Sequence, residues 1–307
     1  MTDTTALAPA PTRTRLLPFA IGVGGGSLGV LPWLVGGARL PLQNLWSSAT
    51  MPGDMPIVML PVSQYFATLL FSLVLIGGVF AGVAVHIVGR RREIAVWPAA
   101  LGVLLVHVIA VVQSFAVVAA GLGLASDRRS IVYLGGMLFG AIAATLMAQL
   151  GFWMTSRRST GIAAFGVALA AVPFGSWAAR WVLAFTGDAL APMWVPELLR
   201  WVPAVVVGLA LAWCGVRPAA RLVVWVVSLL ALWILPALFG AIQYGLGMRV
   251  LKGDLVEMAS ATAQVFPLML GVGGMPVLVA LVIAVVGVLV RSGVASGRRD
   301  DPTVPGR

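Results

Sequence analysis

Long apolar stretches alternate with short polar loops along the whole chain, and every second loop carries arginines. A run of about 20 apolar residues is long enough to cross the hydrocarbon core of a bilayer as a helix, and only helices and closed barrels satisfy their backbone hydrogen bonds in lipid. The pattern therefore predicts an all-α fold, a polytopic integral membrane protein with an eight-helix transmembrane bundle. The expected spans are Leu16–Val35, Tyr65–Val88, Val96–Gly121, Ile131–Met154, Gly161–Ser176, Trp201–Val216, Leu222–Met248 and Val265–Val290.

Composition excludes an ordinary soluble domain. Of the 307 residues, 60% are hydrophobic and 10% are charged, whereas soluble domains are about 25% charged. The mean hydropathy is +1.03. A net charge of +10 would indicate nucleic-acid binding only on a contiguous basic face, but the charges form small clusters at expected helix ends. We therefore expect no nucleic-acid partner. Cys214 is the single cysteine, which excludes intramolecular disulfides and thiolate metal clusters.

The distribution of charge predicts the orientation. One set of alternate loops, with both tails, holds thirteen of the 20 basic residues and four of the 10 acidic ones, and the opposite loops hold seven and six. Positive charge resists translocation, so the first set and both termini are expected in the cytoplasm. Nineteen of the basic residues are Arg, which we interpret as a sign of a GC-rich genome and a bacterial cytoplasmic membrane. The first set comprises Arg13, Arg15, Arg90, Arg91, Arg92, Arg157, Arg158, Arg217, Arg221, Arg291, Arg298, Arg299 and Arg307.

The two halves of the chain resemble each other. Pro32 and Arg39 match Pro173 and Arg180 at a spacing of 141 residues. Other matches at similar spacings pair Pro52 with Pro192, Pro56 with Pro196, Gly135-Gly136-Met137 with Gly273-Gly274-Met275, and Arg157-Arg158 with Arg298-Arg299. We expect two parallel four-helix repeats, related by a pseudo-twofold axis along the membrane normal. The alternative is coincidence of Pro and Arg at helix ends.

This division predicts four regions. They are a cytoplasmic tail at 1–15, a first membrane half at 16–154, a second at 155–290 and a cytoplasmic tail at 291–307. We interpret the first span as retained, because its apolar run is longer than that of a signal peptide and it lacks a small-x-small cleavage site.

Small residues and prolines indicate how the helices meet. Small-xxx-small spacing lets helices approach closely and predicts packing within the chain, with homodimerisation as the alternative. It occurs at Gly22/Gly26, Gly25/Gly29, Gly78/Gly82 and Gly136/Gly140. Pro236 and Pro276 are expected to kink the seventh and eighth spans. The proline-rich segment Leu40–Gln64 cannot be one helix, and it is expected to lie at the outer interface or to fold back over the bundle.

The ionisable groups in the spans are few. No expected span contains Asp or Glu, which argues against a carboxylate-based proton or sodium relay. His86 and His107 are the titratable residues well inside spans, and each is expected to be neutral and bonded to a neighbouring helix. Gly25-Gly26-Ser27-Leu28-Gly29 has the letters of a nucleophile elbow, but that motif needs a strand–turn–helix context. We predict no catalytic residue, no cofactor and no metal site.

Five side chains are the candidate site residues. Arg39 and Arg180 would be equivalent in the two repeats and would hold an anionic group, such as a lipid phosphate or a carboxylate, at the outer boundary. The alternative is that both are snorkelling arginines at helix ends. His107, Gln113 and Gln243 are the candidate polar intramembrane positions; these glutamines, with Gln149, are expected to hydrogen-bond across helices. Anionic lipid headgroups are the expected partners of the cytoplasmic clusters Arg90–Arg92 and Arg157-Arg158.

Three function classes follow. The first is a non-enzymatic accessory, assembly or scaffold component of the bacterial cell envelope, since coupling carboxylates and catalytic groups are missing. The second is a transporter or permease subunit for a small or lipid-like anionic substrate, supported by the repeat and the paired arginines. The third is an intramembrane enzyme, for which Ser27 or Ser114 beside a histidine is the candidate. A scaffold predicts a dry bundle with an outer groove, and a transporter predicts a polar midplane cavity.

Overall fold

The computed structural model describes residues 13–43, 45–122, 124, 128–187, 192–248, 254–271 and 273–297. Within them the secondary structure is helical, with two isolated β-bridges and no strand. Seven helices are long and apolar enough to cross a membrane, or up to eight if one bent pair counts as a single span. The helices are α1 (Arg13–Val35), η1 (Pro52–Asp54), η2 (Gln64–Phe66), α2 (Ala67–Gly89), α3 (Trp97–Gly121), α4 (Arg128–Thr155), α5 (Thr160–Leu169), α6 (Ala171–Thr186), α7 (Val195–Cys214), α8 (Ala220–Gly247), α9 (Leu255–Leu270) and α10 (Gly274–Gly297).

Six expected spans correspond to single helices, namely α1 to α4, α7 and α8. The expected start of the sixth span at Trp201 was wrong, because α7 begins at Val195. Pro196, in the first turn of α7, needs no intrahelical hydrogen bond there, and Glu197 lies near the positive end of the helix dipole. Gly215 ends α7 with a φ of 71°, which favours glycine.

The expected fifth span, Gly161–Ser176, is not one straight helix. It is longer and is divided into α5 and α6, which meet at an angle of 53°. Pro173 lies in the first turn of α6 and has no backbone N–H to donate to the carbonyl of Leu169, so the regular hydrogen-bond series stops where α5 ends.

The expected eighth span, Val265–Val290, was also wrong as one helix, because α9 ends at Leu270 and α10 begins at Gly274. Gly271, Gly273 and Gly274 make the helix costly to continue. Pro276 lies in the first turn of α10, so it begins a helix instead of kinking one. Pro236 does lie inside α8, as expected.

The first half, α1 to α4, packs through glycines. A Cβ at Gly22 of α1 would overlap the backbone of Ala99 in α3, and one at Gly25 would overlap Ala81 in α2. A Cβ at Gly78 of α2 would overlap the carbonyl of Ala148 in α4. Close backbone approach of this kind gives extensive van der Waals contact between the helices. The expected packing within the chain is confirmed for Gly22/Gly26, Gly25/Gly29 and Gly78/Gly82.

The second half, α5 to α10, is also built around one central helix. In the first half α2 packs on α1 and α4; in the second half α7 packs on α5, α6 and α10. Gly208 of α7 lies over the carbonyl of Ala280 in α10, much as Gly78 lies over Ala148. The duplication itself stays a prediction. Its match at Arg298-Arg299, and the charges at Asp3, Asp127, Asp188, Arg249, Lys252, Asp300, Asp301 and Arg307, lie outside the described residues.

The segment between α1 and α2 folds back into the first half, which was one of the two expected arrangements. Met55, Val58, Leu60 and Val62 are fully buried in the core formed with α1 to α4. A β-bridge pairs Arg39 with Ile57 and closes the segment at its base. This segment gives the first half a cap at the end where α1, α3, α6 and α8 finish, which we call the loop end.

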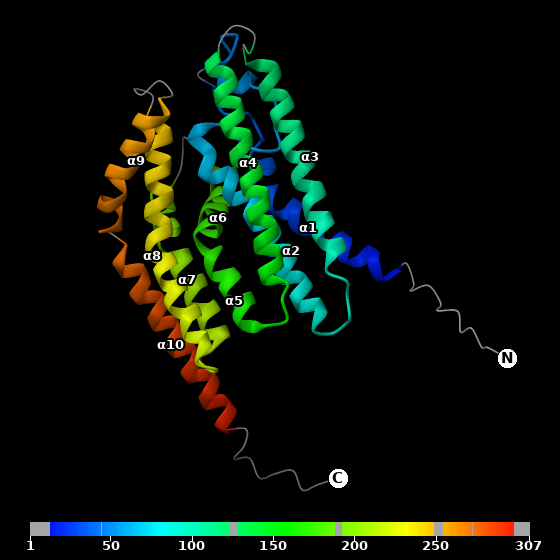
Figure 1. The fold of residues 1–307 in the computed structure, drawn as a ribbon, viewed down its shortest axis with the longest axis vertical. Helices are drawn as coiled ribbons and strands as arrows, with labels where there is room; N and C mark the ends of the chain where they lie inside the picture. Colours follow the sequence, from blue (N-terminus) through cyan, green and yellow to red (C-terminus); the bar gives the residue numbers. More distant parts are fainter. Residues whose placement is uncertain are drawn as a thin grey trace, which may run out of the picture.

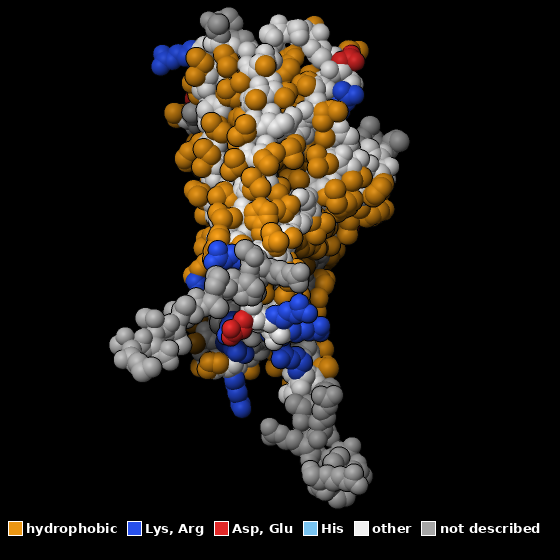
Figure 2. All heavy atoms as spheres, turned by 90° about the vertical axis from the view of Figure 1, so that its right-hand side faces the viewer, with side chains coloured by type: hydrophobic (Ala, Val, Ile, Leu, Met, Phe, Trp, Pro, Cys, Tyr) orange, Lys and Arg blue, Asp and Glu red, His pale blue; other side chains and the backbone are white. Residues whose placement is uncertain are grey.

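Figure 1 shows the two halves side by side, with α5 and α6 between α1–α4 and α7–α10. The halves touch mainly where α6 packs on α1 and α2, where α5 packs on α4, and where α8 meets η2. Figure 2 shows hydrophobic side chains covering the middle of one face and Lys or Arg gathered below them. We call the end of the molecule where α2 and α4 finish, which carries Arg90–Arg92 and Arg157-Arg158, the basic end.

Candidate functional site

A cavity of about 1430 Å³ lies between the two halves, near the loop end. We call it the interhalf cavity. It exceeds the roughly 300–1,000 Å³ of an ordinary small-molecule pocket. Its walls come from the segment after α1, from η2 and the start of α2, from the first half of α4, and from the end of α8 with Met258 of α9. The lining is mostly apolar.

The α4 wall contains two glycines one helical turn apart. Gly136 and Gly140 line the cavity together with Ala141 and Ala143. A Cβ at either glycine would meet nothing within 4 Å. The expectation that this small-residue pair packs against another helix of the chain was therefore wrong among the described residues. The glycines form a smooth strip that faces open space.

The polar side chains of the first-half wall bond to one another. The hydroxyl of Tyr133 donates to Oε1 of Gln43 at 2.6 Å. Nε2 of Gln43 donates to the carbonyls of Pro41 at 2.7 Å and Val62 at 2.9 Å. This network ties the segment after α1 to α4 and fixes the shape of the wall before any ligand arrives.

Three contacts join the halves beside the cavity. Nε2 of Gln243 in α8 donates to the carbonyl of Tyr65 at 2.6 Å, and the hydroxyl of Thr68 donates to Oε1 of Gln243 at 2.9 Å. Phe71 of α2 and Phe239 of α8 meet edge to face, with ring centroids 5.5 Å apart. Both rings line the cavity. Of its lining residues on α2 and α8, these two lie farthest from the loop end.

Arg128 and Arg129 line the loop end of the cavity, in the first turn of α4. Both are exposed. The described residues that line the cavity include these two arginines and no Asp or Glu. The start of a helix also carries partial positive charge from its unpaired N–H groups. The cavity is thus apolar along its length and positive at one end.

The candidate anion-holding arginines lie elsewhere, near the end of α1. Arg39 is exposed and donates to the carbonyl of Met55 at 2.8 Å. Arg180 of α6 is 5% exposed, lies beside Gly36 and stacks over the ring of Trp33 at 5.1 Å. Neither lines the interhalf cavity. Their joint binding of an anionic group stays a prediction.

The candidate polar positions have different surroundings. His107 is fully buried in α3 beside Gly77, and neither ring nitrogen has a hydrogen-bond partner among the described residues, so the expected bond to a neighbouring helix was wrong there. Gln113 bonds to the segment after α1 and not across to another helix as expected: it accepts from Met59 N–H and donates to the Ile57 carbonyl. Gln243 alone of the three lies beside the cavity.

The other polar side chains singled out from the sequence are His86, Gln149, Ser27 and Ser114. His86 bonds the carbonyl of Arg157 at 2.6 Å through Nδ1, so its partner lies in the turn after α4 and not in a neighbouring helix as expected. Gln149 donates to the carbonyl of Ala100 in α3, as expected. Ser114 accepts from the N–H of Leu60, and Ser27 is exposed on α1.

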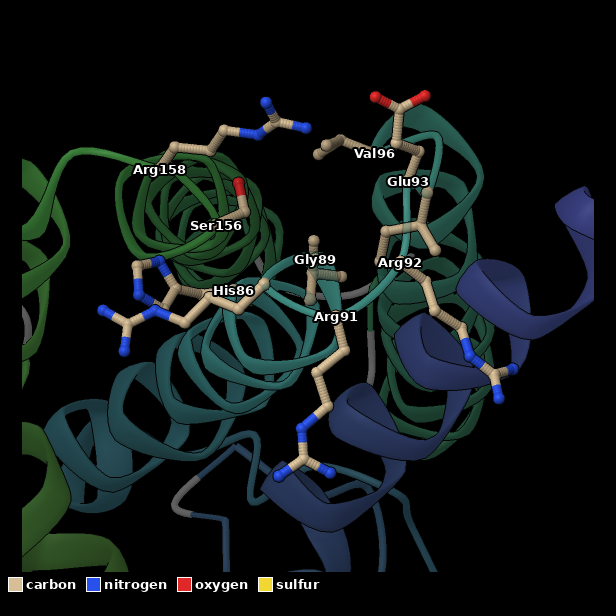
Figure 3. Close-up of a pocket in the computed structure, with 11 residues that line it drawn as sticks. His86, Gly89, Arg91, Arg92, Glu93, Val96, Ser156 and Arg158 are labelled. Carbon is tan, nitrogen blue, oxygen red and sulfur yellow. The ribbon is translucent and has the colours of Figure 1, made fainter. Parts of the chain in front are cut away.

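A second hollow, of about 490 Å³, opens at the basic end between the α2–α3 loop and the end of α4. Figure 3 shows Arg158 extending from beside Ser156 toward the α2–α3 loop, which carries Glu93, whereas Arg91 and Arg92 point away. The arginines do not converge on one point in the hollow. The lipid contacts expected for this cluster stay a prediction.

Sequence reasoning did not identify the interhalf cavity or its arginines. The signal was present in Arg128-Arg129 followed by Gly135, Gly136 and Gly140, but small-residue spacing does not say whether a helix or open space lies opposite. Among the described residues, no three His, Cys, Asp or Glu side chains group closely enough to hold a metal ion. The chain matches no protein-family model, no curated protein and no solved structure.

Proposed function

We propose that this protein is a multi-pass accessory component of the bacterial cell envelope that holds a lipid-like molecule in the interhalf cavity. The observation that carries the proposal is the open glycine strip of Gly136 and Gly140 on the wall of a large, mostly apolar cavity. Apolar chains fill such a surface by van der Waals contact, whereas water finds few hydrogen-bond partners there.

The depth of the cavity supports a lipid of one leaflet. From Arg128 to Ala143, α4 rises by about 22 Å at 1.5 Å per residue. One leaflet with its headgroups is about 20–22 Å thick. With the basic end in the cytoplasm, as charge asymmetry predicts, the cavity lies in the outer leaflet. The protein would hold its ligand without chemistry, for use by other envelope components.

Transport of the same molecule is the second candidate. The cavity lies between two halves that are each built around a central helix, α2 or α7, and halves that rock against each other are common in transporters. Transport would require a path toward the basic end. The pair of Phe71 and Phe239 lies at the deep side of the cavity on this route.

The test is lipid retention by the full chain. We would purify the wild type and the double variant Gly136→Leu/Gly140→Leu in mild detergent and compare bound lipid by native mass spectrometry. The matched control is Gly135→Leu, a glycine of the same helix that also faces open space but does not line the cavity. We expect the control to retain lipid and the double variant to lose it. Equal retention by all three proteins would contradict the proposal.

A further inference from the structure

The interhalf cavity has a polarity along its length that specifies one end of its ligand. At the loop end lie Arg128 and Arg129. From there toward the basic end the α4 wall runs through Val132, Gly136, Gly140 and Ala143, with Tyr133, Met137 and Ala141 beside them. The opposing α8 wall is Phe239, Ile242 and Leu246. A ligand that fits must therefore carry its charge at one end and be apolar over the rest.

The sign of that charge follows from the groups at the loop end. Two guanidinium groups and the start of α4 are all positive, and no described lining residue is acidic. Tyr133 and Gln43 bond to each other, and Gln43 also bonds to the carbonyl of Val62. Among the described residues that line the cavity, Arg128 and Arg129 are the charged side chains.

We infer that the interhalf cavity selects an anionic phospholipid, with its phosphate at Arg128 and Arg129 and an acyl chain along the glycine strip. The inference rests on the proposed function and adds the headgroup class and the residues that read it. Arginine suits this role because its planar fork of donors can bind phosphate through two hydrogen bonds. Zwitterionic lipids of equal chain length fit the apolar part but carry a cationic group that the arginines repel.

The chain and the headgroup are read by different residues, so they can be tested separately. We would titrate the full chain in detergent with phosphatidylglycerol and phosphatidylcholine of identical chains and measure both affinities by native mass spectrometry. For the wild type we expect an affinity about tenfold higher for phosphatidylglycerol, which corresponds to about 1.4 kcal/mol. The double variant Arg128→Gln/Arg129→Gln should bind both lipids with equal affinity.

Two further variants act as controls. Arg200→Gln removes an exposed arginine near the same end that stacks on Trp201 and does not line the cavity, so the tenfold preference should remain. Arg128→Lys/Arg129→Lys keeps the charge and loses the fork, so part of the preference should remain. Raising the salt concentration should reduce the wild-type preference, because the arginines are exposed. Glycerol 3-phosphate has the anionic group but no acyl chain. At the same concentration as the lipid, it should not displace bound phosphatidylglycerol.

The outcomes separate the two claims. Equal wild-type affinity for both lipids, with binding still lost in Gly136→Leu/Gly140→Leu, would overturn the headgroup inference and leave the proposed function standing. A preference that survives Arg128→Gln/Arg129→Gln would also overturn it, by placing the phosphate elsewhere. Binding that is unaffected by the glycine substitutions would remove the proposed function. Competition by glycerol 3-phosphate would assign the site to a soluble phosphate and contradict the lipid as ligand.

Discussion

Two glycine pairs with the same spacing have opposite surroundings in this protein. Gly78 and Gly82 of α2 lie against the backbone of α4, with no room for a Cβ. Gly136 and Gly140, on α4 itself, face the interhalf cavity with nothing within 4 Å. One pair is a packing contact and the other is a wall. The difference shows that small-residue spacing makes a smooth helix face, and that the rest of the fold decides whether protein or ligand covers it.

The strongest way to break this comparison is to add a side chain at the packed pair. Gly78→Leu places four carbons where the carbonyl of Ala148 lies, and only a backbone shift could make room. Overpacking costs about 1–3 kcal/mol and occasionally more, so we expect a large fall in the melting temperature or loss of the monodisperse protein. Fluorescence-detected size exclusion after heating measures both. Gly135→Leu, in open space, is the control, and equal stability of the two variants would contradict the packing described.

The same substitution at Gly136 and Gly140 should change the stability of the protein only when lipid is present. Gly136→Leu/Gly140→Leu should melt at the wild-type temperature in lipid-free detergent. Anionic lipid at about 100 times its dissociation constant should stabilise the wild type by about 2.7 kcal/mol. The double variant should show no such gain, since its leucines occupy the place of the chain. A lipid-dependent gain as large as that of the wild type would show that the lipid binds elsewhere.

The contact between the halves should be weaker than the glycine packing. Gln243→Leu removes two hydrogen bonds, to Tyr65 and Thr68. Interhelical bonds of this kind contribute about 0.6–1.7 kcal/mol, so a loss of about 1–2 kcal/mol is expected in a denaturation experiment. Gln149→Leu, which removes one 3.3 Å bond within the first half, is the matched control and should lose less. The opposite order would mean that the halves are held together by other contacts.

The smallest expected effect is a gain in stability. His107 is buried in the tightly packed half with both ring nitrogens unpaired among the described residues. A buried unpaired polar group is costly, and an apolar side chain of similar size avoids that cost. His107→Leu should therefore raise the free energy of unfolding by about 1 kcal/mol. His86→Leu should lower it, because His86 bonds the carbonyl of Arg157. A loss of stability in His107→Leu would indicate a partner for that ring.

The sequence predicted the helices well wherever apolar runs and polar loops alternate, as in α2, α3 and α8. It failed where a proline lies two residues after a pair of small residues inside an apolar run, as Pro173 does after Ala170-Ala171 and Pro276 after Gly273-Gly274. Near Ala170 and Gly271–Gly274 hydropathy stays high while the backbone hydrogen bonds are interrupted, so an apolar window sees one span and the chain forms two helices. Hydropathy reports on burial in lipid, and continuity of a helix depends on its N–H groups.

The candidate site was harder to predict than the fold. Gln243 and the Gly136/Gly140 pair were singled out from the sequence. However, three parts of the chain that are far apart in sequence form the cavity together: α4, α8 and the segment that follows α1. Arg128 and Arg129 have the same sequence signature as any arginines that mark a helix end. The concave surface between the halves gives them a different setting, and no local pattern encodes that surface.

The most direct test of the account is a structure of the full chain determined by cryo-electron microscopy in nanodiscs that contain phosphatidylglycerol. The account predicts elongated density along Gly136 and Gly140. The headgroup should lie at Arg128 and Arg129, and the acyl chain should extend toward Phe71 and Phe239. An interhalf cavity closed by α8 and α9 against α4, with those glycines covered by protein side chains, would contradict it.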